Sequence, residues 1–175
     1  GTGSGAIAVA LAVRLRERDG DAGVRIHAVD VSPEALEVAA ENVAAQAVGG
    51  IVRLVRADLL PEGADPFRLV IANLPYVRTA DLAPAPDPTA HEPKSALDGG
   101  PDGLRVVARL LEQLPGALTP DGLALLEIGA DQGETLPALV AATLPGWRCE
   151  ILPDLAGLPR IARLRPPGRA SGSAA

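Results

Sequence analysis

The chain has 175 residues, enough for one domain with a hydrophobic core, and 47% of them are hydrophobic. No apolar run approaches the roughly 18 residues of a membrane span, and the first residues lack the pattern of a secretory signal. With a single cysteine in the chain, we therefore expect a cytoplasmic protein without a membrane segment. The net charge of −6 argues against broad, sequence-independent binding to nucleic acid, and the single Cys149 offers neither an internal disulfide nor a cysteine cluster for a metal.

The first third of the sequence alternates helix and strand patterns. Apolar residues at four-residue spacing predict a helix over residues 4–18, followed by a loop. Ser32 and Pro33 are a typical helix start, with serine as the N-cap and proline in the first turn. We therefore predict a helix from Pro33 to about Ala47. The segments on either side of it, residues 24–30 and 51–57, are predicted to be strands.

The pattern continues after a short connection. Strand 67–73 is followed by Pro- and Asp-rich residues 77–100, a loop long enough to suggest a function. Further on we predict helix 102–118, strand 123–128, helix 132–143 and closing strands 148–152 and 160–164. Because strands and helices alternate, the sheet is expected to be parallel and doubly wound, a Rossmann-like α/β fold. We assign residues 1–165 to one domain and expect residues 166–175 to form a disordered tail.

The beginning of the sequence indicates a missing element. Gly1-Thr2-Gly3-Ser4-Gly5 has the composition of a turn that needs a strand before it, and the sequence contains no methionine. We therefore expect a fragment whose first strand lies upstream.

Candidate functional residues follow the predicted strands. Ligands of an open parallel sheet bind outside the carboxyl ends of the strands, where the glycine turn, Asp30 and Asp58 are expected to meet. The turn lets backbone approach an anionic ligand, Asp30 suits the hydroxyls of a ribose, and Asp58 suits the amino group of an adenine. The alternatives are an ordinary turn, a helix-capping acid and a solvated acid. These features fit either a nicotinamide dinucleotide or S-adenosylmethionine.

The segment Asn73-Leu74-Pro75-Tyr76 favours S-adenosylmethionine. The Asn73 amide oxygen and the Leu74 carbonyl, held extended by the following proline, can accept both hydrogens of one NH₂ group. Tyr76 offers a flat face for a planar amide or base. Since an amide nitrogen is a poor nucleophile, orientation and electrostatic stabilisation must supply much of the catalysis. The alternative is a proline-containing turn that ends a strand.

At this point the sequence resembles the HemK/PrmC-type protein-glutamine methyltransferases. The blocks "GTGSGAIAVALA", "AVDVSPEALEVAAENV", "RADLL", "IANLPYV", "HEPKSALDGGPDGL", "GLALLEIGADQGE" and "DLAGLPRIARL" occur in the order typical of that family, over nearly all of residues 1–165. The resemblance implies methyl transfer from S-adenosyl-L-methionine to a glutamine amide of a protein, in the best-known members the Gly-Gly-Gln loop of a peptide-chain release factor. Apart from this resemblance, no His, Cys and Asp residues have the spacing of metal ligands and the chain is acidic, so we expect no metal and no direct nucleic-acid partner.

The resemblance also implies roles for individual residues. Asp30 would bind the ribose, Asp58-Leu59 the adenine, and Asn73 with the Leu74 carbonyl the glutamine amide, in a pocket shaped by Pro75 and Tyr76. Asn73 is counted with the cofactor residues too, and the methionine part of the cofactor would be held by Gly1, Thr2, Gly3, Ser4 and Gly5.

The sequence departs from the family in two ways. Position 74 is leucine where proline is usual, and both the strand before the glycine turn and the helical N-terminal domain are missing. Rival functions are a nucleic-acid amino-methyltransferase with the same Asn-X-Pro-Tyr device, a nicotinamide-dependent oxidoreductase, and a non-catalytic gene product.

Overall fold

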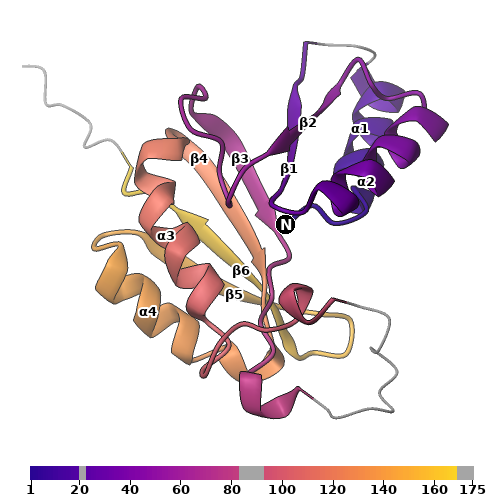
Figure 1. Cartoon of the computed structure of the whole chain (residues 1–175). Coiled ribbons are helices and arrows are strands. Elements are labelled where there is room, and N and C mark those ends of the chain that lie inside the picture. Colours follow the sequence, from indigo (N-terminus) through magenta and orange to yellow (C-terminus); the bar gives the residue numbers. More distant parts are fainter. Residues whose placement is uncertain (20–22, 83–92, 169–175) are drawn as a thin grey trace, which may run out of the picture. The chain divides into compact units, whose positions relative to one another are not determined.

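The computed structural model describes residues 1–19, 23–82 and 93–168, and it divides the chain into two compact units, Gly1–Ala64 and Asp65–Ala175 (Figure 1). Both units combine helices with strands, as the sequence predicts. The assignment of residues 1–165 to one domain stays a prediction. None of the described helices is long and apolar enough to cross a membrane.

The first unit consists of two helices and a two-stranded parallel sheet. Its elements are α1 (Ala6–Asp19), β1 (Ile26–Asp30), α2 (Pro33–Ala45) and β2 (Val52–Arg56). At the start of α2, the Ser32 hydroxyl oxygen accepts a hydrogen bond from the Ala35 amide at 3.1 Å, which confirms the predicted N-cap. The strands pair in register from Ile26 and Val52 to Asp30 and Arg56, so their carboxyl ends lie side by side.

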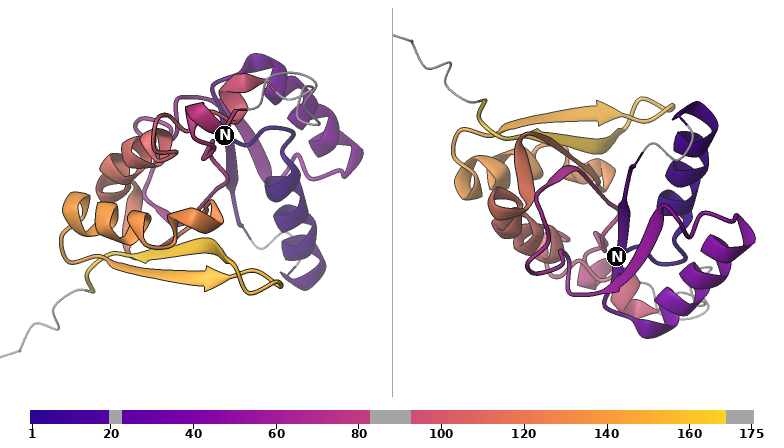
Figure 2. Two further views of the ribbon diagram at one scale, coloured as in Figure 1. Left: turned by 90° about the horizontal axis from the view of Figure 1, so that it is seen from below. Right: turned by 90° about the horizontal axis from the view of Figure 1, so that it is seen from above.

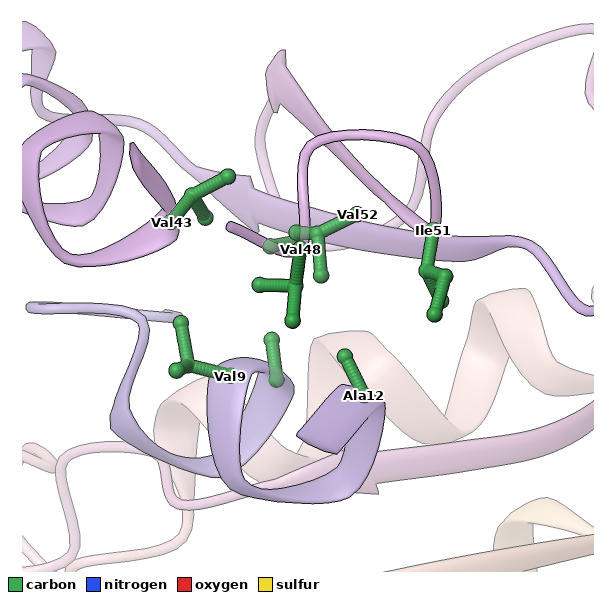
Figure 3. Packing of buried hydrophobic residues seen from close by; sticks show 8 residues of the cluster. Val9, Ala12, Val43, Val48, Ile51 and Val52 are labelled. Carbon is green, nitrogen blue, oxygen red and sulfur yellow. The ribbon is translucent and has the colours of Figure 1, made fainter. Parts of the chain in front are cut away.

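Small apolar side chains hold the first unit together. Both helices pack on the sheet, and the valines and alanines between them let the backbones come close (Figure 3). Ala12 and Val48 have almost no exposed surface. The buried cluster consists of Ala8, Val9, Ala12, Ala28, Val43, Val48, Ile51 and Val52.

The second unit has a four-stranded sheet in the order β3-β4-β6-β5. Strands β3 and β4 are parallel, whereas β6 runs antiparallel to both β4 and β5. Helices α3 and α4 lie on the same face of this sheet (Figures 1 and 2). The elements are β3 (Phe67–Ala72), η1 (Thr79–Asp81), η2 (Lys94–Ala96), α3 (Arg105–Ala117), β4 (Leu118–Glu127), η3 (Ala130–Gln132), α4 (Thr135–Thr143), β5 (Arg148–Pro153) and β6 (Pro159–Arg165).

The core of the second unit is built mainly from leucines. Four of them, on α3 and β4, are almost completely buried: Leu110, Leu111, Leu114 and Leu126. Leu136 and Val140 of α4 and Leu164 of β6 are equally buried. The buried residues of α3 and α4 recur three or four positions apart and so mark the faces that pack on the sheet.

Several boundaries differ from the prediction. Helix α3 begins at Arg105 instead of residue 102, because the Asp102 side chain accepts a hydrogen bond from the Leu104 amide and Gly103 has a φ of +75°. Strand β4 begins five residues earlier than predicted, and its pairing with β3 shifts register between Phe67 and Leu69. The helix predicted from residue 132 begins at 135, after the turn η3.

The loop predicted at residues 77–100 is more regular than expected where the structure describes it. It contains the short helices η1 and η2 and a parallel bridge between Val77 and Asp98. Residues 83–92 lie outside the described residues, as do residues 169–175 of the predicted tail.

Candidate functional site

The glycine turn lies at the carboxyl end of β1. The Thr2 amide donates to the Val29 carbonyl at 2.7 Å, and the turn closes with a bond from the Gly5 amide to the Thr2 carbonyl. Gly3 and Gly5 have φ values of +55° and +76°, a conformation that glycine adopts at little cost. A Cβ atom on Gly5 would lie 3.1 Å from the Cβ of Ala39 in α2, whereas one on Gly3 would meet nothing within 4 Å.

Asp30 joins this turn to the start of α2. It is 8% exposed, and its two carboxylate oxygens accept hydrogen bonds from the Gly3 amide at 2.8 Å and from the Ser32 amide at 3.0 Å. The amino group of Gly1 lies 3.9 Å from the same carboxylate. Asp30 therefore supports both the glycine turn and the start of α2, where Ser32 is the N-cap.

Asp58 and Leu59 follow β2 at the same edge. The Ala57 amide donates to the Asp30 carbonyl at 3.1 Å, which brings the two strand ends together. Leu59 has a φ of +72°, which is uncommon for a residue with a side chain and often accompanies functional sites. The structure thus brings the predicted cofactor residues of the first unit together.

The predicted acceptor residues follow β3 in the second unit. Asn73 is exposed, and within the described part of the chain its carboxamide has no hydrogen-bond partner. The Leu74 side chain next to it is only 5% exposed, and Pro75 and Tyr76 are partly buried. A polar amide is therefore presented directly after a residue that is anchored in the core.

The chain after Tyr76 is tied to the turn before α3. The Val77 amide donates to the Leu97 carbonyl at 3.0 Å, the Gly99 amide to the Val77 carbonyl at 2.8 Å, and the Thr79 amide to the Gly100 carbonyl at 2.9 Å. We call residues 73–79 the acceptor segment and residues 97–104 the glycine brace. These backbone bonds fix one against the other.

Asp98 strengthens this connection. Its carboxylate accepts hydrogen bonds from the Thr79 hydroxyl at 2.6 Å, the Gly100 amide at 2.9 Å and the Arg105 guanidinium at 3.3 Å. The bond from Thr79, with those from Gly100 and Arg105, holds the pKa of Asp98 below its ordinary value of 3.8. One carboxylate thus joins the acceptor segment, the glycine brace and α3.

The glycines of the brace are required by close packing. A Cβ on Gly99 would lie 2.8 Å from the Pro75 carbonyl oxygen. A Cβ on Gly103 would overlap the Tyr76 carbonyl oxygen and would lie 2.6 Å from the Gln132 side-chain nitrogen. The backbone of the acceptor segment therefore rests directly on glycine backbone.

Sequence reasoning missed Gln132 and gave the brace no structural role. Gln132 is a buried amide of η3 that bonds to both the acceptor segment and the brace. The available signal was the glycine-rich stretch "LDGGPDGL", because glycines allow another segment of backbone to approach closely. That the acceptor segment and the cofactor residues face one common site stays a prediction. No three His, Cys, Asp or Glu side chains in residues 1–19, 23–82 and 93–168 are placed to hold a metal ion.

The sequence of this chain is similar to those of several known proteins. No protein-family model matches the chain. Over 143 residues, 82% of this chain and 50% of the relative, it is 40% identical to the release factor glutamine methyltransferase of Deinococcus radiodurans. The chain is a homologue of the protein-glutamine methyltransferases. It is also 48% identical over 105 residues to the ribosomal protein uL3 glutamine methyltransferase of Bradyrhizobium diazoefficiens, covering 59% of this chain and 33% of that protein.

Two further facts qualify this homology. The chain spans about half the length of the release factor glutamine methyltransferases that it matches. Among solved structures, a methyltransferase from Pyrococcus furiosus is similar with a TM-score of 0.65 and 20% identity, over 96% of this chain and 72% of the other. This likeness concerns the fold only, and it confirms the predicted Rossmann-like fold. The expectation of a parallel sheet is wrong for β6, which runs antiparallel to both of its neighbours.

Proposed function

We propose that this protein transfers a methyl group from S-adenosyl-L-methionine to the side-chain amide nitrogen of a glutamine in a protein. The observation that carries the proposal is the acceptor segment: Asn73 is exposed, and the residues from Pro75 to Thr79 that follow it are held against the glycine brace. The homology to proteins named as glutamine methyltransferases supports it. The cytoplasmic location expected from the sequence belongs to the same proposal.

The first unit fits the proposed cofactor. A carboxylate offers about four acceptor positions, and backbone amides of Gly3 and Ser32 use two of those on Asp30, so two remain for the hydroxyls of a ribose. Gly3 leaves open space beside its backbone, where the methionine part would lie. Asp58 and Leu59 at the neighbouring strand end would contact the adenine.

The acceptor segment would supply orientation. When bound, S-adenosylmethionine provides a methyl group on a sulfonium centre. The Asn73 amide oxygen and the Leu74 carbonyl would accept the two hydrogens of the glutamine amide, which directs the nitrogen lone pair at the methyl carbon and stabilises the positive charge developing on nitrogen. Transfer would exchange the carbon–sulfur bond of the bound cofactor for a nitrogen–carbon bond, and the methylated amide would release its extra proton to solvent. Pro75 and Tyr76 would shape the pocket around the planar amide.

The proposal also specifies which protein carries the glutamine. The relatives are named for two substrates, a release factor and ribosomal protein uL3. We propose a release factor with a Gly-Gly-Gln loop, because release factor methyltransferases match the larger share of this chain.

The test is a methylation assay with S-adenosylmethionine carrying a labelled methyl group. A release factor, its Gly-Gly-Gln to Gly-Gly-Ala variant, ribosomal protein uL3 and a DNA duplex are each incubated with the full protein. We expect label on the release factor, located by mass spectrometry on the loop glutamine, and none on the alanine variant. Label on uL3 alone would change the substrate, and label on the duplex alone would overturn the proposal in favour of nucleic-acid methylation.

A further inference from the structure

Gln132 is a buried polar residue within the second unit. It is 1% exposed, whereas glutamine side chains are mostly exposed in folded proteins. A buried amide is stable only when hydrogen bonds replace its contacts with water. The hydrogen-bond partners of Gln132 therefore show which segments of the chain it holds together.

The Gln132 carboxamide connects three segments that are far apart in the sequence. Its oxygen accepts a hydrogen bond from the Gly129 amide at 3.0 Å. Its nitrogen donates one hydrogen to the Gly103 carbonyl at 3.1 Å and the other to the Tyr76 carbonyl at 3.3 Å. Both hydrogens of the amide are thus used on backbone carbonyls, one of the acceptor segment and one of the glycine brace.

A second connection runs between η3 and the acceptor segment, but it is exposed. The Asp131 carboxylate pairs with the Arg78 guanidinium at 2.5 Å, and both side chains are about half exposed. Solvent screens such a pair, and exposed ion pairs contribute little. The buried amide of Gln132 is therefore the stronger tie between η3 and the acceptor segment.

We propose that Gln132 is a positioning residue for the glutamine-binding pocket. It fixes the carbonyl of Tyr76, and with it the path of the chain that presents Asn73 and the Leu74 carbonyl. This inference rests on the proposed function, since it assigns Gln132 to the same acceptor pocket. An apolar side chain of similar size would fill the volume but would leave the three backbone groups without a partner.

The test compares Gln132→Met and the milder Gln132→Asn with Leu136→Ala in the full protein. Methionine keeps the volume and removes the hydrogen bonds, and asparagine keeps the amide on a shorter side chain. Leu136 is buried on α4 and has an apolar side chain, so its truncation weakens the core of the same unit but removes no hydrogen bond to the acceptor segment. Rates are expressed per folded molecule, counted by cofactor-binding stoichiometry.

We expect Gln132→Met to lower kcat for glutamine methylation about 10- to 100-fold, with Gln132→Asn in between, because small displacements of orienting groups cost rates of this order. The Kd for S-adenosylmethionine should stay within about twofold of the parent value. Leu136→Ala should leave kcat per folded molecule unchanged. Equal kcat in the parent and in both Gln132 variants, or an equal loss in Leu136→Ala, would overturn the proposal.

Amide hydrogen exchange separates this inference from the proposed function. In Gln132→Met, the Val77 and Thr79 amides should exchange at least about tenfold faster, while amides of α4 keep their protection. If the parent protein methylates no glutamine, the proposed function fails, yet faster exchange at Val77 and Thr79 would still show that Gln132 holds this segment. Unchanged exchange at both amides would refute the positioning role by itself.

Discussion

Replacing Gly103 with alanine tests whether the acceptor segment depends on the glycine brace. Gly103 has a φ of +75°, and a left-handed conformation costs a residue with a Cβ roughly 1–2 kcal/mol. The added methyl group would also overlap the Tyr76 carbonyl and approach the Gln132 side-chain nitrogen to 2.6 Å. Loss of that hydrogen bond leaves buried polar groups unpaired, at about 1–3 kcal/mol. We expect Gly103→Ala to lower the free energy of unfolding by roughly 2–5 kcal/mol in total.

Gly157→Ala is the matched control. Gly157 lies in the same unit and has a φ of +83°, but a Cβ there would meet nothing within 4 Å. Its replacement therefore carries only the backbone cost of roughly 1–2 kcal/mol. The difference between the two variants isolates the contact with Tyr76 and Gln132.

The measurement is urea unfolding of the full protein and both variants, followed by circular dichroism. The Gly103 variant should be less stable than the Gly157 variant by about 1–3 kcal/mol. Methyl transfer per folded molecule should fall in the first variant and stay at the parent level in the second. Equal stabilities for the two variants would refute the close packing on which the brace depends.

Three other substitutions test the acceptor segment and the glycine brace. Asn73→Ala should lower kcat for methyl transfer by roughly 10²–10³, the effect of deleting one preorganised polar group, while calorimetry should find the S-adenosylmethionine affinity nearly intact. Full activity would disprove its role. Leu74→Pro should keep most of the activity, since the backbone carbonyl remains. Its stability in thermal unfolding should fall by about 1–2 kcal/mol because the leucine side chain is buried. An inactive but folded variant would contradict the role of this carbonyl. Asp98→Asn should destabilise the protein at neutral pH, and the difference should vanish as the pH falls below 3.8 through the lowered pKa of Asp98, where the parent loses the same charge; a gap that is constant across pH would contradict this account.

The order of elements could be predicted because it depends on local signals. Four-residue apolar spacing and the Ser32-Pro33 helix start are properties of short stretches, and the structure contains the corresponding helices and strands. The meeting of the glycine turn, Asp30 and Asp58 also followed from the sequence, because the carboxyl ends of adjacent parallel strands share an edge.

The support of the acceptor segment could not be predicted in this way. Gln132 and Tyr76 are 56 residues apart, and neither has a local pattern that indicates the other. The predicted helix from residue 132 even placed Gln132 in a regular helix, whereas its side chain bonds to Gly129 in a separate turn. Such contacts depend on how distant loops pack.

Two glycines show why the sequence pattern alone does not predict how tightly a residue is packed. Gly3 and Gly103 both have positive φ and both lie in short glycine-rich stretches, so the local sequence pattern does not distinguish their surroundings. A Cβ on Gly3 would meet open space, whereas the place that a Cβ on Gly103 would take is occupied by the Tyr76 carbonyl and the Gln132 amide. The first arrangement leaves backbone accessible to a ligand, and the second makes a rigid support. A substitution at either position is strained by its backbone, but only at Gly103 should the damage spread to the acceptor segment.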